Sequence, residues 1–444
     1  MIHLLYDKGS ITIRGDVATP YGHWDPRINA YRAIALYYEE IKSFLDNSGI
    51  SYKDDVPALM PIPSLRCTVS LRPYQEDALK AWTNAGKRGV IVLPTGAGKT
   101  FIAIKAIEIL NQPTLIIVPT IDLIDQWKKH LVRQFNVDVG VVGGGEERIK
   151  ALTVSTYDSA VIRAEQLGNV FMFLIFDEVH HLPAPTYSQI AEMYIAPYRM
   201  GLTATYERED DAHRNLPRLM GGKVFEVDVD SLTGKHLSPY TYEKVWVELT
   251  LQEKEDYVRE YAVFTNYLRS RGIKLRSPND FQRFIMMTGR DPEARKALLA
   301  RNRALRIVLN SEAKIEALGK YLSSNRDEKS LIFTRYNALV YTISRRFLIP
   351  AITHLTQKEE RREVLEKFRT GFYRAIVTSQ VLDEGIDVPD ASVGFILGGT
   401  GSSREYIQRL GRILRKKEGK EAKLIEFVAK ETVETRISQR RHGS

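Results

Sequence analysis

Cysteine is almost absent from the sequence, since Cys67 is the only one among 444 residues. A single thiol excludes an internal disulfide and a zinc site built from several cysteines, and it suits a reducing compartment. We therefore expect a cytoplasmic protein that has no disulfide-linked partner.

Long apolar runs are missing as well. No uninterrupted stretch approaches the roughly 18 apolar residues that a membrane-spanning helix needs, which excludes an integral membrane protein. The segment from Met1 to Asp7 has neither a basic stretch nor a long apolar one, so we expect no secretory signal there.

The composition is that of a folded globular protein, with 43% hydrophobic and 27% charged residues. At roughly 100–200 residues per domain, the length predicts two to four domains. The net charge of +9 permits an anionic partner such as nucleic acid.

Residues 1–64 are typical of a small separate module. Residues 10–15 alternate apolar and polar side chains, which predicts a half-buried strand, and the spacing of apolar residues over 29–47 predicts a helix. Three prolines between 57 and 63 then indicate a stiff linker. With 6 Lys and Arg against 8 Asp and Glu, the module has a net charge of −2, so charge alone does not mark it as DNA-binding.

Short apolar strands alternate with helical stretches along the rest of the chain, which predicts parallel sheets covered by helices on both faces. The strongest strand signals are at 89–93, 114–118, 152–155, 171–176, 330–333, 374–377 and 393–397. We expect two tandem α/β domains, over residues 65–235 and 236–444.

The second of these domains contains a helix-rich insertion at about 252–310. It holds 13 Lys and Arg against 7 Asp and Glu, a net charge of +6, with six aromatic residues interleaved. One interpretation is a projecting thumb that grips DNA, because basic residues with interleaved aromatics suit a nucleic-acid groove. The other is an amphipathic helical hairpin with ordinary solvated charges.

A phosphate-binding loop is indicated where the strand at 89–93 meets the next helix. The segment reads, in order, Leu93, Pro94, Thr95, Gly96, Ala97, Gly98, Lys99 and Thr100. Glycines let successive N–H groups face phosphate oxygens, and the helix N-terminus adds partial positive charge. Lys99 would reach the β- and γ-phosphates and the Thr100 hydroxyl would bind Mg²⁺. The strict pattern has glycine where this chain has Leu93.

Two acids, Asp177 and Glu178, end the strand at 171–176, 78 residues after Lys99. The carboxyl end of a strand faces the crevice in which α/β proteins bind ligands. Asp177 would hold Mg²⁺ and Glu178 would polarise the attacking water, because phosphoanhydride hydrolysis needs positioning and charge neutralisation. His180 would relay between this site and another element.

A basic helix in the second domain carries Gln408, Arg412 and Arg415. Arginines three apart share one helix face, and guanidinium groups delivered across a cleft stabilise charge on a departing γ-phosphate. A basic surface helix is the alternative.

Together the motifs resemble those of superfamily-two helicases, and more narrowly the XPB family, the helicase of transcription factor TFIIH, in its short archaeal form. The matching segments, in family order, are 71–75, 93–100, 118–120, 177–180, 202–205, 332–335, 378–387 and 408–415. Val179 and the Arg208, Glu209, Asp210 triplet carry the narrower resemblance. It implies two tandem RecA-like domains, a small N-terminal α+β damage-recognition module and a helical thumb.

The resemblance also implies residue roles. Lys99, Asp177, Glu178, Arg412 and Arg415 would be catalytic. The nucleotide would be bound by Arg72, Gln75, Pro94, Thr95, Gly96, Ala97, Gly98, Lys99, Thr100, Gly385 and Asp387, with Gln75 reading adenine. Mg²⁺ would be held by Thr100 and Asp177. Coupling between nucleotide state and domain movement would use His180, Thr203, Thr205 and Gln408. Nucleic acid would be contacted by Arg208, Glu209, Asp210, Arg335 and Thr378.

The implied activity is an ATP- and Mg²⁺-dependent DNA helicase, moving 3′ to 5′, that opens DNA in nucleotide excision repair or transcription. Its partners would be DNA at single-strand/duplex junctions and a nuclease of the archaeal Bax type. Two alternatives share the motifs. One is a duplex DNA translocase with little processive unwinding, and the other is a damage-recruitment ATPase.

Overall fold

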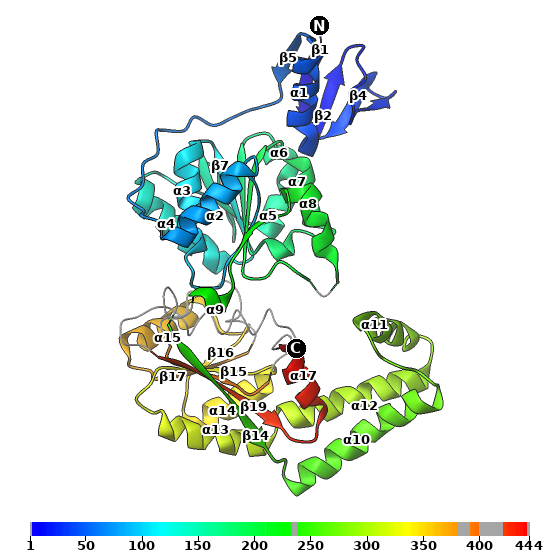
Figure 1. The fold of residues 1–444 in the computed structure, drawn as a ribbon, viewed down its shortest axis with the longest axis vertical. Coiled ribbons are helices and arrows are strands. Elements are labelled where there is room, and N and C mark those ends of the chain that lie inside the picture. Colours follow the sequence, from blue (N-terminus) through cyan, green and yellow to red (C-terminus); the bar gives the residue numbers. More distant parts are fainter. Residues whose placement is uncertain (1, 209, 233–237, 380–390, 399–420, 442–444) are drawn as a thin grey trace. The chain divides into compact units, whose positions relative to one another are not determined.

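The computed structural model describes residues 2–208, 210–232, 238–379, 391–398 and 421–441 (Figure 1). These residues form two compact units that divide between Ser231 and Leu232. Among the described residues, no helix has the length and apolar character needed to cross a membrane.

The first unit begins with a five-stranded sheet in the order β3-β4-β2-β1-β5, backed by one helix. Its elements are β1 (Ile2–Asp7), β2 (Ser10–Arg14), β3 (His23–Asp25), β4 (Ala30–Ile34), η1 (Ala35–Tyr37), α1 (Tyr38–Asn47) and β5 (Tyr52–Asp55). The helix predicted over 29–47 is therefore wrong in its first third. Residues 30–34 pair with β2 instead, because a sheet partner overrides a helical spacing of apolar residues.

This N-terminal sheet packs on the remainder of the first unit through side-chain hydrogen bonds and a close backbone approach. The Tyr6 hydroxyl lies 2.8 Å from the Ala164 carbonyl oxygen and 3.0 Å from that of Met193. Gly9 has φ +89°, and a Cβ there would come within 2.6 Å of the Met193 side chain. The close approach therefore requires glycine at this position.

The rest of the first unit, called the first lobe here, is an eight-stranded sheet in the order β13-β6-β12-β11-β7-β10-β8-β9. Its strands are β6 (Arg88–Val92), β7 (Thr114–Val118), β8 (Gly140–Gly143), β9 (Glu146–Arg148), β10 (Leu152–Thr156), β11 (Phe173–Asp177), β12 (Tyr198–Thr203) and β13 (Lys223–Glu226). Its helices are α2 (Pro73–Asn84), α3 (Lys99–Leu110), α4 (Ile121–Phe135), α5 (Tyr157–Ile162), α6 (Ala164–Leu167), η2 (Val179–His181), α7 (Ser188–Met193), η3 (Ala212–Asn215), α8 (Leu216–Met220) and α9 (Val229–Leu232).

Helices cover this sheet, so its central strands are largely apolar and buried. All five residues of β7 are buried, as are the first four of β11. Seven of the eight strands run parallel, β13-β6-β12-β11-β7-β10-β8, and only β9 is antiparallel to its neighbour. Their carboxyl ends therefore meet at one edge, where the candidate site residues of this lobe lie.

The second unit carries a six-stranded, all-parallel sheet in the order β14-β19-β18-β15-β17-β16. Its strands are β14 (Tyr240–Val247), β15 (Ser330–Phe333), β16 (Ala351–Ile352), β17 (Ala375–Thr378), β18 (Val393–Ile396) and β19 (Ala422–Ala429). The helices packed around it are α13 (Glu312–Ser324), α14 (Asn337–Phe347), α15 (Lys358–Thr370) and α17 (Val433–Arg441). We call this sheet and these helices the second lobe. The predicted fold class, two tandem parallel-sheet domains, is confirmed.

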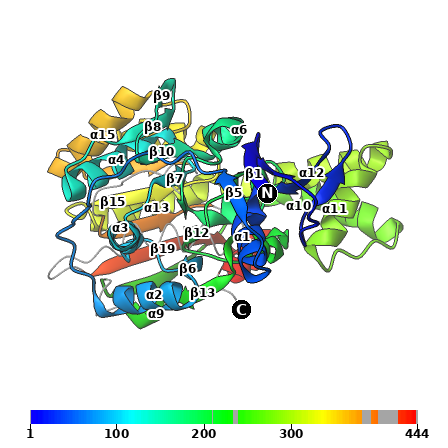
Figure 2. The same ribbon diagram turned by 90° about the horizontal axis from the view of Figure 1, so that it is seen from above.

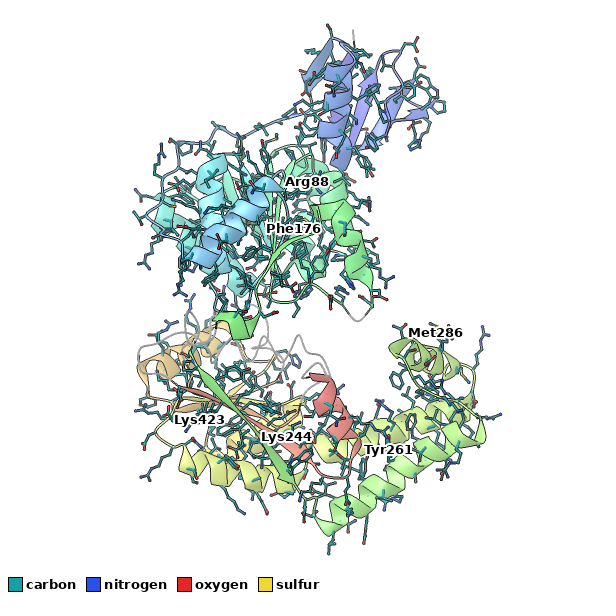
Figure 3. The ribbon with its side chains drawn as sticks, viewed as in Figure 1. Arg88, Phe176, Lys244, Tyr261, Met286 and Lys423 are labelled. Carbon is teal, nitrogen blue, oxygen red and sulfur yellow. The ribbon has the colours of Figure 1, made fainter. Side chains whose placement is uncertain are left out.

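The thumb consists of α10 (Leu251–Ser270), α11 (Pro278–Met287) and α12 (Pro292–Leu309), which gather to one side of the second-lobe sheet (Figures 1 and 2). Four of the six aromatic residues interleaved in the thumb are not exposed for stacking on DNA bases, and contact of the thumb with DNA stays a prediction. Tyr257, Phe264, Tyr267 and Phe284 are buried, because they pack in the cores that these helices form. The exposed thumb surface is instead charged, with apolar exceptions such as Met286 (Figure 3).

Candidate active site

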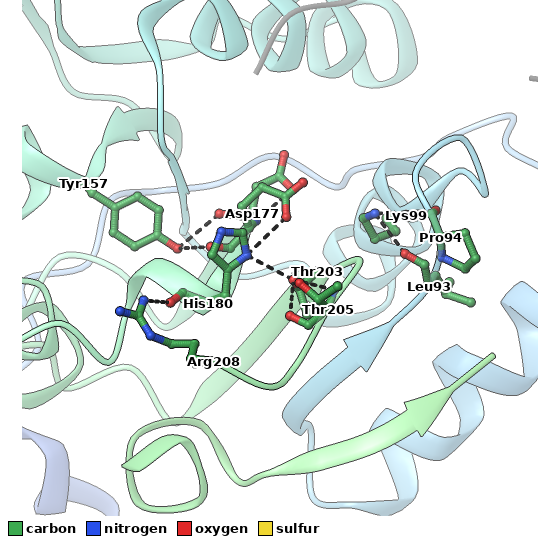
Figure 4. Close-up of polar contacts among 10 residues, drawn as sticks. Leu93, Pro94, Lys99, Tyr157, Asp177, His180, Thr203, Thr205 and Arg208 are labelled. Atoms are coloured by element: carbon green, nitrogen blue, oxygen red, sulfur yellow. Dashed lines mark hydrogen bonds and ion pairs between the residues drawn. The ribbon is translucent and has the colours of Figure 1, made fainter. Parts of the chain in front are cut away.

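The loop between β6 and α3 has the backbone of a phosphate-binding loop. Gly96 and Gly98 have φ of +85° and +77°, which side chains disfavour. A Cβ at Gly98 would also lie 2.6 Å from the Gln75 amide nitrogen. The Lys99 ammonium donates to the Leu93 carbonyl at 3.0 Å and reaches the Pro94 carbonyl at 3.5 Å (Figure 4). The loop thus holds its lysine in place through its own carbonyls.

The start of α2 is fastened to this loop. The Gln75 side chain, 3% exposed, accepts from the Arg72 backbone N–H at 2.9 Å and donates to the Ala97 carbonyl at 2.8 Å. The Tyr74 hydroxyl donates to the same carbonyl at 2.7 Å. Gln75 is therefore a neighbour of the loop, while its reading of adenine remains a prediction.

Asp177 ends β11 with both carboxylate oxygens held by donors. The Trp127 indole N–H donates to Oδ2 at 2.8 Å, and the Glu178 backbone N–H donates to Oδ1 at 3.1 Å. Burial, and after it the neighbouring Glu178 charge, raises the pKa of Asp177 to about 6. The Trp127 hydrogen bond and the Lys99 charge oppose that rise in pKa.

Glu178 has a left-handed backbone, with φ +49°, an uncommon conformation for a residue that has a side chain. The Tyr157 hydroxyl lies 3.1 Å from the Asp177 carbonyl oxygen and 3.4 Å from that of Glu178. It therefore stabilises this turn by donating to its backbone carbonyls. The turn aims the Glu178 carboxylate toward His180, whose Nδ1 lies 3.4 Å from Oε2.

His180 joins this turn to the end of β12. The Thr203 hydroxyl donates to the Thr205 carbonyl at 2.8 Å, and its oxygen accepts from the Thr205 N–H at 3.1 Å. Because that hydroxyl hydrogen is already used, the 3.2 Å contact between His180 Nδ1 and Thr203 Oγ1 requires the imidazole to donate. His180 therefore carries a proton on Nδ1, and it is fully buried.

Arg208 extends the same network. Its guanidinium donates twice to the Asp210 carboxylate, at 2.8 and 2.6 Å. It also donates once to the His180 carbonyl (Figure 4). This bidentate pairing holds the pKa of Asp210 well below its usual range. The expected nucleic-acid contact of both residues remains a prediction, and the contacts that the structure has are internal to the first lobe.

Arg335 and Thr378 lie at the carboxyl ends of adjacent strands in the second lobe. Phe333 pairs with Thr378, so the two candidate residues share one edge of the sheet. The Thr378 hydroxyl is buried and donates to the Ser379 carbonyl at 3.0 Å, while the Arg335 guanidinium lies 5.6 Å from the Tyr336 ring centre. Their contact with a nucleic-acid backbone remains a prediction.

Six predicted site residues lie outside the described part of the chain. They are Glu209, Gly385, Asp387, Gln408, Arg412 and Arg415.

The first-lobe donor set suits Mg²⁺ held jointly with a nucleotide. Mg²⁺ is usually bound through one or two carboxylates together with substrate phosphates. The described residues contain no cluster of three or more His, Cys, Asp or Glu that would hold a metal unaided. The Thr95 hydroxyl oxygen within the loop is buried and has no hydrogen-bond partner among the described residues, so it can bond a phosphate oxygen.

Sequence reasoning missed two residues of this site, Trp127 and Tyr157. Both are buried aromatics, and their burial alone suggests core packing. Trp127 falls on the apolar stripe of α4, with Leu123, Ile124 and Leu131. The only sequence signal was indirect, since a buried tryptophan needs a partner for its N–H.

Three family models match the chain. The "Xeroderma pigmentosum group B helicase damage recognition domain" matches residues 4–56, and the "Type III restriction enzyme, res subunit" matches residues 68–208. The "Helicase conserved C-terminal domain" matches residues 313–417. The helicase domains imply an ATP-dependent activity.

A solved structure supports the fold alone. The helicase domain of Hef from Pyrococcus furiosus superposes with a TM-score of 0.52 at 19% identity, covering 82% of this chain and 97% of that one.

Curated relatives resemble the chain more strongly. The "DNA 3'-5' helicase XPB" of Mycobacterium tuberculosis is 30% identical over 84% of this chain and 63% of its own length. The "DNA 3'-5' translocase XPB2" of Sulfurisphaera tokodaii is 47% identical over 99% of this chain and 100% of its own length. The chain therefore belongs to the XPB family of helicases.

Proposed function

We propose that this chain is an ATP-driven DNA motor that moves 3′ to 5′ and opens DNA during repair or transcription. One observation carries the proposal. Lys99, Asp177 and Glu178 gather at the carboxyl edge of the first-lobe sheet, and side-chain hydrogen bonds run from there to Thr203 and Arg208. The names of the relatives, DNA helicase and DNA translocase, support the choice of DNA as the substrate.

ATP would bind through the loop from Pro94 to Thr100, with Lys99 on the β- and γ-phosphates. Thr100 and Asp177 would hold Mg²⁺, which supplies neutralising charge to the phosphates. Glu178 would orient the attacking water, and His180 Nδ1, 3.4 Å from Glu178 Oε2, would help to hold the carboxylate in place. Gln75 and Arg72 would border the adenine.

His180, Thr203 and Thr205 would couple nucleotide state to movement. Thr203 and Thr205 are joined by two hydrogen bonds, and His180 links them to the turn that carries Glu178. A change in the position of Glu178 on hydrolysis would therefore shift His180 and, through it, Thr203 at the end of β12. Arg208 would extend this coupling through the His180 carbonyl.

The second lobe would complete the site. We propose domains at 1–64, 65–235 and 236–444, with Arg412 and Arg415 as arginine fingers, Gln408 as a coupling residue and Gly385 and Asp387 near the nucleotide. Alternate closing and opening of the two domains would then move the protein along one strand. Arg335, Thr378, Arg208, Glu209 and Asp210 would contact DNA.

A duplex translocase with little processive unwinding is the second candidate. The name of the Sulfurisphaera tokodaii relative, a translocase, favours it. Displacement of a strand from a fork supports the helicase, whereas displacement of a third strand from a triplex without fork opening supports the translocase. We also propose action on DNA in the cytoplasm together with a nuclease of the archaeal Bax type.

The primary test is the rate of ATP hydrolysis with single-stranded DNA, duplex DNA, forked DNA and RNA. We expect DNA to stimulate ATP hydrolysis. Lys99→Ala should lower the hydrolysis rate by at least about 100-fold, because it removes the positive charge that would neutralise the phosphates. Lys105→Ala is the matched control, since Lys105 lies on the same helix and pairs with Glu108 at 2.6 Å instead. DNA-stimulated hydrolysis that survives Lys99→Ala would contradict the proposal.

A further inference from the structure

Trp127 and Asp177 come from different elements and meet at the carboxyl edge of the first-lobe sheet. Trp127 lies in the second turn of α4, the helix that follows β7, and Asp177 ends β11 beside β7. The Trp127 side chain is 1% exposed, and its N–H donates to Asp177 Oδ2 at 2.8 Å. A buried side chain from one element thus fixes the carboxylate of another.

A second tryptophan in the same lobe shows what a structural indole does. Trp82 of α2 is fully buried, and its N–H donates to the Arg199 carbonyl at 2.9 Å. Its partner is a backbone group at the start of β12, whereas the partner of Trp127 is a carboxylate at the end of β11. Packing requires the ring in both cases, but the acceptors differ.

We propose that Trp127 is a positioning residue for the metal-binding carboxylate of Asp177, an assignment that rests on the proposed function. The indole N–H is only a donor, so it always occupies a lone pair of Oδ2. The Glu178 N–H occupies one of Oδ1 at 3.1 Å. With both oxygens held, the carboxylate plane is fixed and the remaining lone pairs are left for Mg²⁺ or its water.

The energetic argument concerns preorganisation. A carboxylate that must rotate into place on metal binding loses rotamer freedom at that moment, whereas one already held by donors does not. Partners of metal-binding side chains typically contribute about 10–100-fold to metal affinity or activity. We expect the lower end for Trp127, about 10-fold, because the Glu178 N–H would remain.

The experiment measures the affinity of the full-length protein for ADP by calorimetry, with Mg²⁺ and with EDTA. The ratio of the two affinities isolates the contribution of the metal. Trp127→Phe removes the N–H and keeps an aromatic ring, and Trp82→Phe is the matched control. Because Trp127→Phe also leaves a cavity, 3-benzothienylalanine at position 127 serves as a second variant that keeps the bicyclic shape and removes only the donor.

We expect the ratio to fall about 10-fold for both variants at position 127 and to stay within twofold of wild type for Trp82→Phe. Affinity in EDTA should be unchanged in all of them. A ratio within twofold of wild type for the benzothienyl variant would overturn the assignment, as would an equal loss with and without Mg²⁺. If wild-type protein bound ADP without any dependence on Mg²⁺, the proposed function would fail together with this assignment.

Discussion

The two ends of β12 are built from different kinds of contact. At its start, the Arg199 guanidinium is fully buried and donates to four backbone carbonyls, those of Ala191, Tyr194, Ala196 and Leu219. At its end, Thr203 is held by His180, a titratable side chain, and the Arg208 guanidinium lies nearby. Only the carboxyl end joins side chains that can change charge or partner.

The difference separates fold from function within one strand. Backbone carbonyls do not titrate, so the Arg199 contacts that fix α7 and α8 against the sheet do not depend on the charge of a partner side chain. The contacts at the carboxyl end link the turn of Glu178 to groups that a nucleotide would touch. Substitutions at the start of β12 should therefore reduce stability, and substitutions at its end should reduce turnover or coupling.

The largest effect is expected at the start of the strand. Arg199→Met should lower the free energy of unfolding by about 3–5 kcal/mol, because four buried carbonyls lose their donor. Urea unfolding measures it. Arg88→Met is the matched control, since Arg88 pairs with Arg199 in the sheet register but is partly exposed beside Glu40 (Figure 3). Its expected loss is below about 1 kcal/mol. Equal losses of unfolding free energy in Arg199→Met and Arg88→Met would contradict the stabilising role assigned to the buried contacts of Arg199.

At the other end, Glu178→Gln should reduce ATP turnover by about 100- to 1,000-fold and leave the unfolding midpoint nearly unchanged. The amide keeps the shape but cannot polarise water, so ATP-bound protein should accumulate on DNA. Steady-state hydrolysis and filter binding of labelled ATP measure the two parts. Glu165→Gln, on the exposed side of α6, controls for charge. Unchanged turnover in Glu178→Gln would remove the water-orienting role.

A smaller effect is expected at Arg208. Arg208→Lys keeps the charge but cannot bond Asp210 in a bidentate manner and also reach the His180 carbonyl. We expect stimulation of ATP hydrolysis by DNA to fall about 5- to 10-fold, which is about 1–1.4 kcal/mol of coupling, with basal hydrolysis preserved. Arg214→Lys is the control, because Arg214 is exposed and pairs with Asp211 at 3.4 Å. Weaker DNA affinity with normal stimulation would instead favour direct DNA contact by Arg208.

The smallest effect is expected far from β12, on the thumb. The double variant of Arg283→Gln and Arg290→Gln should reduce the slope of log affinity for DNA against log salt by about 1.8, if each arginine contacts one phosphate. Both side chains are exposed. Arg326→Gln, exposed on the second lobe, should leave the slope unchanged. An unchanged slope in the double variant would favour the alternative of an amphipathic hairpin with ordinary solvated charges.

Patterns that depend on neighbouring residues were predictable from the sequence. The loop from Leu93 to Thr100 and the acids at Asp177 and Glu178 each follow a strand, and the structure has them at the carboxyl edge of one sheet. Local chemistry determines such sites, because glycines at fixed positions and a helix start are enough to form the loop.

Patterns that depend on distant partners were not predictable. The helix predicted over 29–47 is wrong at 30–34, where β2 provides a sheet partner. The thumb aromatics look like stacking platforms in sequence, but their burial depends on how the three helices meet. Trp127 reads as a core residue of α4, and only the tertiary fold brings its N–H to a carboxylate 50 residues away.

The most direct test of the central claim is a crystal structure with Mg²⁺, a non-hydrolysable ATP analogue and forked DNA. We predict phosphates on Lys99, the metal beside Thr100 and Asp177, and Arg412 and Arg415 facing the γ-phosphate. A triphosphate bound elsewhere, or one that these arginines do not approach in any crystal form with DNA, would contradict the account.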